Sequence, residues 1–193
     1  MDKFNKKYNI ILDLDNTLIS SLDPKEFKTH KNNCRGLKYT QMKNYFYIFH
    51  RPYLQEFLDY LFDNFNVSVW TAGTKDYGTF IVKHIILNPQ PYEDDSVPKN
   101  RPERVLKLIL HSKNCDQSEY LYKTPTPKDL RYIYNFPGFN ENNTFIVDDL
   151  QEVKDVNKNN VIQIKYFDAK NSQCVNDNEL KNIIKKLNKI LHN

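Results

Sequence analysis

The sequence predicts an α/β fold in which helices flank a central, mostly parallel β-sheet. Short apolar runs recur along the chain, and stretches with helical periodicity separate them. Apolar runs of this length are typical of strands buried on both faces, and their alternation with helices is the pattern of layered α/β proteins. The four expected strands are Tyr8–Leu14, Val67–Trp70, Thr144–Val147 and Val161–Ile164.

Three helices are expected between or after these strands. From Leu54 to Phe65, apolar residues recur at three- and four-residue spacing, and Pro52 suits the first turn of a helix. A second helix is expected around 77–85, ending before Pro89. The last, from about Leu180 to Leu191, carries lysines opposite an apolar stripe, which favours a surface helix packed on a core over a membrane anchor.

Two segments interrupt this alternation. Ser20–Phe49 is long for a connection and ends in the strand-like sequence YFYIF, which predicts a flap or hairpin beyond the carboxyl end of the first strand. Residues 88–126 form an expected insertion that begins with a Pro-rich, charged stretch. Within it, the stretches RVLKLIL and EYLYK are expected to pair as an inserted β-hairpin. The whole chain, 1–193, is interpreted as one domain.

Length and composition exclude several classes of protein. With 193 residues, 39% hydrophobic and 13% aromatic, the chain can form a core and is too apolar to be disordered. The net charge of +4 is far below that of a dedicated nucleic-acid-binding protein, so no direct nucleic-acid binding is expected. Three distant cysteines and four glycines indicate neither a zinc site nor a Gly-rich nucleotide loop. The absence of a signal peptide or transmembrane pattern predicts an intracellular protein, nuclear or cytoplasmic.

Acidic residues and a threonine follow the ends of the expected strands. Asp13 and Asp15 end the first strand, Thr71 follows the second, and Asp148 and Asp149 end a later one. Ligands of open parallel sheets bind outside the carboxyl ends of the strands, so these side chains are expected to meet. Like charges about 4 Å apart oppose one another by roughly 4 kcal/mol at an effective dielectric near 20, so the cluster needs a cation. Oxygen ligands beside a phosphate favour Mg²⁺.

Taken singly, each of these residues has a structural explanation, because Asp and Thr commonly cap helices and turns. Their order along the chain is more specific. It is carried by the segments ILDLDNTLISS, HRPYLQEFL, VSVWTAGTKDYG, PKDL and TFIVDDL. From about Asn9 to Phe167, this order resembles the haloacid dehalogenase superfamily of aspartate-nucleophile phosphatases. More narrowly, the chain resembles the NLI-interacting-factor-like phosphatases that act on the C-terminal domain of RNA polymerase II.

Three features depart from the pattern of this branch. Asn16 follows Asp15 in the opening motif, where the branch usually has Glu. The segment between 88 and 128 is expanded. The stretch YKTPTPKDL offers two lysines, Lys123 and Lys128, and the KDL context favours Lys128 as the phosphate-binding residue.

The resemblance implies a phosphoryl transfer in two steps. It implies that Asp13 is the nucleophile and forms an aspartyl-phosphate. Asp15 is implied first as the acid that protonates the leaving oxygen and then as the base that activates water. The implied cofactor is Mg²⁺, bound by Asp13, the main-chain carbonyl of Asp15 and Asp148.

The resemblance also assigns binding and supporting roles. Thr71 and Lys128 are implied to bind the phosphoryl oxygens. Asp149 is implied either as an outer-sphere ligand of the metal or as a residue that orients Lys128. Thr17 is implied to steady the loop after the first strand.

The implied substrate is phosphoserine or phosphothreonine in an extended, proline-containing peptide. No large helical cap is evident, so the expected partner is a phosphorylated protein or peptide, and the chain is expected to be a monomer without a membrane association. Aromatic residues of KNYFYIF could contact such a peptide, although strand packing explains them as well. Two alternatives stay open. One is a phosphatase of small metabolites or nucleotides, and the other is a catalytically weak binding protein of the same fold.

Overall fold

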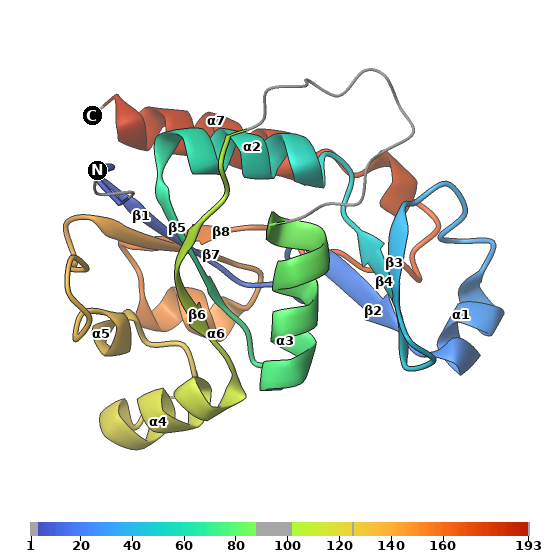
Figure 1. Ribbon diagram of the computed structural model, residues 1–193, viewed down its shortest axis with the longest axis horizontal. Coiled ribbons are helices and arrows are strands. Elements are labelled where there is room, and N and C mark those ends of the chain that lie inside the picture. The colour runs from blue at the N-terminus through green and yellow to red at the C-terminus, as the bar shows by residue number, and fades with distance from the viewer. Residues whose placement is uncertain (1–3, 88–101, 125, 193) are drawn as a thin grey trace.

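The main sheet of the protein has five parallel strands in the spatial order β6-β5-β1-β7-β8 (Figure 1). The computed structural model describes residues 4–87, 102–124 and 126–192. Along the chain the strands are β1 (Asn9–Leu12), β5 (Asn66–Trp70), β6 (Leu106–Leu110), β7 (Thr144–Asp148) and β8 (Val161–Gln163). The strand order reverses at β1, so a ligand crevice is expected there, outside the carboxyl ends. The predicted parallel sheet is confirmed.

Strand β1 occupies the centre of the sheet because both of its faces are apolar. Alternate residues of a strand point to opposite faces. Ile10 and Leu12 accordingly enter the core on one side of the sheet and Ile11 the core on the other, and all three are fully buried. A polar residue at any of these positions would be buried in an apolar layer without a partner.

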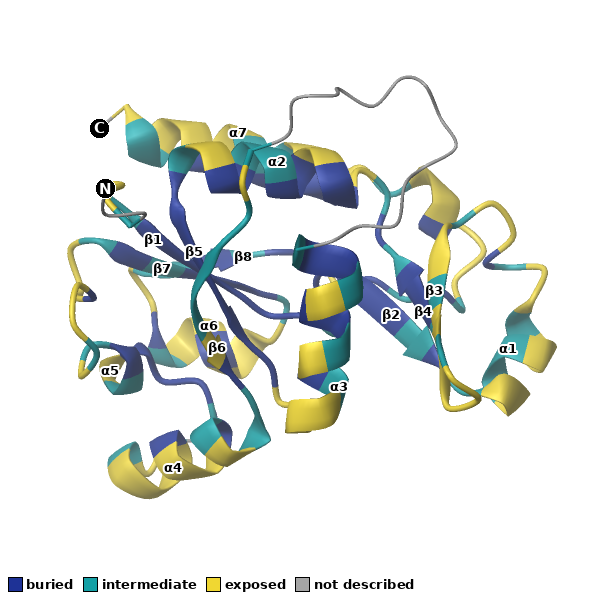
Figure 2. Cartoon of the chain, in the orientation of Figure 1, coloured by how far each residue is buried: buried dark blue, intermediate teal, exposed yellow. Residues whose placement is uncertain are grey.

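Helices cover both faces of the sheet. The first face packs against α2 (Leu54–Asn64), α3 (Lys75–Ile81) with its π-helical continuation η1 (Val82–Leu87), and α7 (Glu179–Leu191). The second packs against α4 (Ser112–Tyr122), α5 (Leu130–Ile133) and α6 (Gln151–Val156). Figure 2 shows α2 and α7 with buried residues toward the sheet and exposed residues outward, as their predicted periodicity requires. Among the described residues, no helix is long and apolar enough to cross a membrane.

A smaller sheet follows the carboxyl end of β1. Its three strands are antiparallel, in the order β2 (Ile19–Leu22), β4 (Phe46–His50) and β3 (Tyr39–Met42). Helix α1 (Pro24–His30) lies between β2 and β3 along the chain, and Asp23 caps it by accepting hydrogen bonds from two backbone N–H groups of the first turn. We call residues 19–50 the flap. The predicted hairpin is confirmed as β3 and β4, and α1 and β2 extend it.

The expected inserted β-hairpin is wrong. Strand β6 pairs in parallel with β5, with Leu106 opposite Val67, so the stretch RVLKLIL belongs to the main sheet. The stretch EYLYK lies at the end of helix α4, at whose start the backbone N–H of His111 donates to Oδ1 of Asn114 at 3.0 Å. The edge of β5 offers β6 a row of backbone hydrogen bonds, and this tertiary pairing overrides the local hairpin preference. Residues 88–101 of the expected insertion lie outside the described residues.

Candidate active site

Two predicted acidic residues meet at the carboxyl ends of the two central strands. Asp13 follows β1 directly and Asp148 ends β7, and these strands pair in parallel with Leu12 opposite Val147. The backbone N–H of Asp13 donates to the carbonyl of Val147 at 3.1 Å, so the strands stay joined where the carboxylates begin. Both acidic side chains are buried. The reversal of strand order therefore brings two carboxylates from distant parts of the chain together at the carboxyl edge of the sheet.

Lys128 lies between these two carboxylates. Its Nζ donates to Oδ1 of Asp13 and to Oδ2 of Asp148, the latter at 2.9 Å, and the residue is 2% exposed. Asn157 holds its backbone, because the side-chain Nδ2 of Asn157 donates to the carbonyl of Lys128 at 2.8 Å. Lys123, the other lysine considered from the sequence, is exposed at the end of α4. The structure thus brings Lys128, and not Lys123, to the acidic residues.

Three carboxylates offer ligand atoms to one metal ion. One oxygen each of Asp13, Asp148 and Asp149 lies within 4.8 Å of the others. Other oxygens are engaged: Oδ1 of Asp148 accepts from the backbone N–H of Leu150 at 2.9 Å, and Oδ1 of Asp149 accepts from the Thr17 hydroxyl at 2.8 Å. Three ionised carboxylates beside one ammonium group leave an excess of negative charge. An oxygen donor set with this charge fits a hard divalent cation.

The electrostatics of the cluster favour a bound cation. Burial raises the pKa of the Asp13 carboxyl, and Lys128 only partly offsets this. Burial and the charge of Asp13 raise the pKa of Asp148 to about 6, again against the effect of Lys128. Burial acts to lower the pKa of Lys128, but the charges of the two aspartates outweigh it and raise this pKa. Lys128 therefore keeps its proton. Its single positive charge does not fully offset the rise in the pKa values of Asp13 and Asp148, so a bound cation would further stabilise their ionised forms.

Asp15 contacts a residue that the sequence analysis did not place in the site. The hydroxyl of Tyr77, in α3, donates to Oδ1 of Asp15, and it lies 2.6 Å from Oγ of Ser21 in β2. Burial raises the pKa of Asp15, and the hydrogen bond from Tyr77 opposes this rise. Burial and the charge of Asp15 raise the pKa of Tyr77, which keeps the phenol a hydrogen-bond donor. The sequence contains one clue to this contact. Tyr77 carries a polar hydroxyl, although its position was interpreted only as part of the apolar face of a helix.

Asn16, the departure from the family pattern, shapes the loop after β1. Its φ of 61° lies in the left-handed region, which Asn tolerates better than most residues. The backbone N–H of Asn16 donates to the carbonyl of Ile19 at 2.7 Å, and its side-chain amide donates to the carbonyl of Phe167 at 3.0 Å. Arg51 donates to the carbonyl of Thr17 at 2.8 Å. The loop is therefore held both by the segment after β8 and by the residue after β4.

Thr71 ends the neighbouring strand on the other side of β1. It directly follows β5 and is 1% exposed. Its hydroxyl oxygen accepts from the backbone N–H of Gly73 at 2.9 Å. A Cβ on Gly73 would lie 3.1 Å from this oxygen and 2.7 Å from the ring of Tyr77, so only glycine fits between them. The turn before α3 thus links the position of Thr71 to that of Tyr77.

Residues 8–193 match the family model of the NLI interacting factor-like phosphatases. The chain belongs to this family. The CTD phosphatase-like protein 355R of Invertebrate iridescent virus 3 is 39% identical over 189 residues, covering 95% of this chain and 96% of the relative. The protein of the same name from Invertebrate iridescent virus 6 is 37% identical over 191 residues, covering 95% of this chain and 99% of the relative.

Solved structures support the fold of this member of the NLI interacting factor-like phosphatases. Fcp1, an essential RNA polymerase II CTD phosphatase, aligns with a TM-score of 0.59 at 19% identity, covering 96% of this chain and 62% of that one. A fission yeast Fcp1 variant bound to beryllium fluoride gives a TM-score of 0.52 at 21% identity, with 96% and 51% covered. The chain thus spans less than two thirds of these Fcp1 chains. The expected α/β fold, with helices on both faces of a mostly parallel, Rossmann-like sheet, is confirmed.

Proposed function

We propose that this chain is a Mg²⁺-dependent phosphoprotein phosphatase that forms an aspartyl-phosphate on Asp13. The proposal rests on one observation, the contact of the buried Lys128 with the buried carboxylates of Asp13 and Asp148 where the strand order reverses. A phosphoryl group bound in this crevice would meet a nucleophile, a fixed positive charge and ligands for a divalent ion. Membership in a phosphatase family supports the same reaction class.

In the first half-reaction, a carboxylate oxygen of Asp13 attacks the phosphorus of the substrate. The bond between phosphorus and the seryl or threonyl oxygen breaks, and Asp15 donates a proton to that leaving oxygen. The raised pKa of Asp15, which its burial causes, favours the protonated form that this step needs. Because Tyr77 donates to Oδ1 of Asp15, the transferable proton is left to Oδ2.

In the second half-reaction, a water molecule attacks the phosphorus and Asp15 accepts its proton. The bond between phosphorus and the Asp13 oxygen breaks, and inorganic phosphate leaves. Lys128 and the hydroxyl of Thr71 bind the phosphoryl oxygens and balance their charge. Asp13, Asp148 and the main-chain carbonyl of Asp15 would hold Mg²⁺, which when bound supplies positive charge that screens the nucleophile from the phosphate.

Asp149 and Thr17 support this arrangement from beside the nucleophile. Because Asp13, Asp148 and the main-chain carbonyl of Asp15 are the proposed direct ligands, we assign Asp149, whose oxygen lies within 4.8 Å of one oxygen of Asp13 and one of Asp148, to the outer sphere of the proposed metal site. Its other contact is the hydroxyl of Thr17, which belongs to the loop after β1. The pair therefore ties this loop to the end of β7, and we propose that it keeps the distance between Asp13 and Asp148 constant.

The proposed substrate class is phosphoserine or phosphothreonine in an extended peptide. The viral relatives are named CTD phosphatase-like, and Fcp1 is a phosphatase of the RNA polymerase II CTD. The C-terminal domain of RNA polymerase II is therefore the first protein substrate to test. Release of phosphate from Ser-, Thr- and Tyr-phosphorylated peptides, measured beside nucleotides and sugar phosphates, ranks the substrate classes by kcat/KM. A higher kcat/KM on nucleotides or sugar phosphates than on phosphopeptides would contradict the proposed peptide substrate and indicate a small-molecule phosphatase.

The test of the chemistry uses p-nitrophenyl phosphate. Asp13→Asn should abolish turnover while the urea unfolding transition stays cooperative, and EDTA should stop the wild-type enzyme until Mg²⁺ is restored. Turnover by Asp13→Asn would exclude the nucleophile, and metal-independent turnover would exclude the cofactor. Lys128→Met, which keeps the volume of the side chain, should lose far more activity than the exposed control Lys123→Met. The opposite order would reassign the phosphate-binding lysine.

A further inference from the structure

The flap carries the entire net charge of the chain. Its residues, 19–50, include six lysines and arginines and two acidic residues, a net charge of +4 that equals the value for the full sequence. Both acidic residues are engaged, since Asp23 caps α1 and Glu26 lies 3.4 Å from the amine of Lys170. The rest of the sequence is neutral overall. Positive charge concentrated on one element attracts negatively charged partners.

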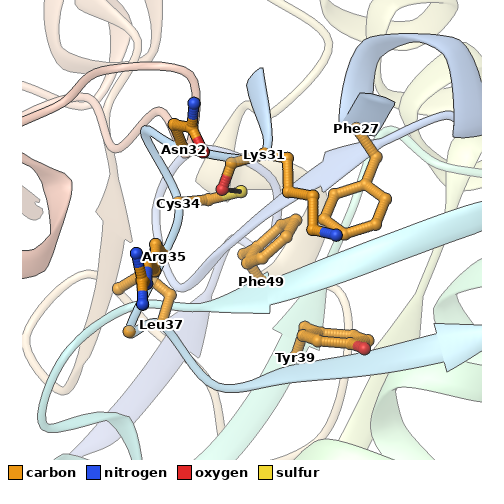
Figure 3. A pocket seen from close by; sticks show the side chains of 9 residues that line it. Phe27, Lys31, Asn32, Cys34, Arg35, Leu37, Tyr39 and Phe49 are labelled. Carbon is orange, nitrogen blue, oxygen red and sulfur yellow. Dashed lines mark hydrogen bonds between the residues drawn. The ribbon is translucent and has the colours of Figure 1, made fainter. Parts of the chain in front are cut away.

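A pocket of about 430 Å³ opens in the flap beside α1 and β3 (Figure 3). The rings of Phe27, Tyr39 and Phe49 form an aromatic wall, with the centroid of Phe49 at 5.9 Å from Phe27 and 5.5 Å from Tyr39. Arg35 and Leu37 lie across from this wall in Figure 3. A volume of this size is typical of sites that accept a ligand group. The wall favours a large apolar side chain as that group.

The pocket is separate from the crevice that holds Asp13. Ile48 of β4 belongs to the main core, and the next residue, Phe49, points to the opposite face of the small sheet. Tyr39 of β3 pairs with Phe49, which places the two rings on that same outer face. The pocket therefore shares no residue with the proposed catalytic machinery.

Two basic side chains stand at the pocket. Lys31 and Arg35 both line it and both are exposed, and none of the described lining residues is acidic. Within the part of the chain that the structure describes, neither side chain has a hydrogen bond or an ion pair. An aromatic wall flanked by two uncompensated positive charges is complementary to an apolar side chain flanked by negative charges.

We propose that the pocket docks an acidic segment of the phosphoprotein substrate. One large apolar side chain of the segment enters the aromatic wall, and carboxylate or phosphate groups next to it pair with Lys31 and Arg35. This inference rests on the proposed function, because it concerns another part of the same substrate. Strand β2 begins at Ile19, close to Asp15, and β3 lies two strand spacings from β2, roughly 10 Å. An extended peptide advances about 3.3 Å per residue, so roughly three residues cover this spacing within the sheet, and further residues are needed to pass to the outer face that carries the pocket.

The direct test measures binding by fluorescence anisotropy. The probe is a labelled, unphosphorylated peptide with glutamates around one phenylalanine, and its control carries glutamines instead. The charge reversal Lys31→Glu with Arg35→Glu should weaken binding of the acidic peptide roughly tenfold and leave the glutamine peptide unchanged, because exposed ion pairs become repulsive. The matched reversal Lys185→Glu with Lys189→Glu, on the exposed side of α7, should leave binding unchanged. Tyr39→Ala should weaken binding of both peptides.

Kinetics link the pocket to the substrate. Adding the acidic segment to a phosphoserine peptide should lower KM without changing kcat, and the Lys31 and Arg35 reversal should remove this gain while p-nitrophenyl phosphate turnover stays the same. Equal binding of the acidic peptide by wild type and the reversed variant would overturn the proposal. Tighter binding of a single-stranded oligonucleotide of equal charge would also overturn it. Peptide binding as expected with no hydrolysis of p-nitrophenyl phosphate would refute the proposed function and leave the docking pocket supported.

Discussion

Replacing Arg51 should destabilise the protein by about 3 kcal/mol. This side chain is 1% exposed and donates two hydrogen bonds to Asp177, at 2.9 and 2.8 Å, and one to the carbonyl of Thr17, at 2.8 Å. It follows β4 directly, so it joins the flap, the loop after β1 and the segment before α7. Arg51→Met removes the three hydrogen bonds but keeps an unbranched side chain.

The magnitude follows from the burial of the two partners. Breaking a buried ion pair by removing one partner costs about 3–5 kcal/mol, chiefly because the remaining charge stays buried and unpaired. The side chain of Asp177 is 19% exposed, so water reaches it and the cost lies at the lower end. In a chain of 193 residues, about 3 kcal/mol corresponds to a decrease in Tm of roughly 6–12 °C.

Urea unfolding followed by tryptophan fluorescence measures this loss. Trp70 is the single tryptophan of the chain and is fully buried, so its emission reports on unfolding of the main sheet. A double-mutant cycle with Asp177→Asn separates the ion pair from other effects, and the double variant should lose less stability than the two single losses combined. A loss under about 1 kcal/mol for Arg51→Met, or strictly additive losses, would refute the reasoning.

Three further outcomes are expected. Gly73→Ala places a Cβ 2.7 Å from the Tyr77 ring and should cost about 1–3 kcal/mol in urea unfolding, whereas Gly78→Ala, with its nearest contact at 3.1 Å, should be nearly neutral because helix propensity offsets the strain. Tyr77→Phe should lower kcat roughly tenfold more for an alkyl phosphate than for p-nitrophenyl phosphate. Only the alkoxide leaving group needs the proton that Asp15 delivers, because p-nitrophenolate leaves without one. Equal losses of kcat on the two substrates would indicate a structural role for Tyr77. Because the raised pKa of Asp148 lets the folded protein hold a proton that the unfolded chain loses, metal-free stability should fall as the pH rises from the ordinary value of 3.8 to about 6. Thermal unfolding should then show a larger Mg²⁺-induced rise in Tm near pH 7 than near pH 5, and an equal rise would contradict the competition between metal and proton.

Local pattern was sufficient to predict four of the five strands of the main sheet, the helices α2, α3 and α7, and the acidic residues at the strand ends. Asp13 and Asp148 stand where the apolar runs stop, and β1 and β7 end at or next to them. Helix α7 ends at Leu191, as its apolar periodicity predicts. These features depend on the order of neighbouring residues. The local spacing of apolar side chains determines whether a strand is buried on both faces and which stripe of a helix faces the core.

Partners that are distant along the chain could not be chosen in the same way. Lys123 and Lys128 are equivalent by residue type, and only the resemblance of the KDL context favoured Lys128. In the structure they are separated by the backbone path held by Asn157, which carries Lys128 to Asp13. The contact of Tyr77 with the acidic loop and the parallel pairing of β6 are of the same kind. Each of these contacts depends on which segments pack together after the chain has closed long loops. The free energy of this packing comes from many residues far apart in sequence, so the local pattern does not determine it.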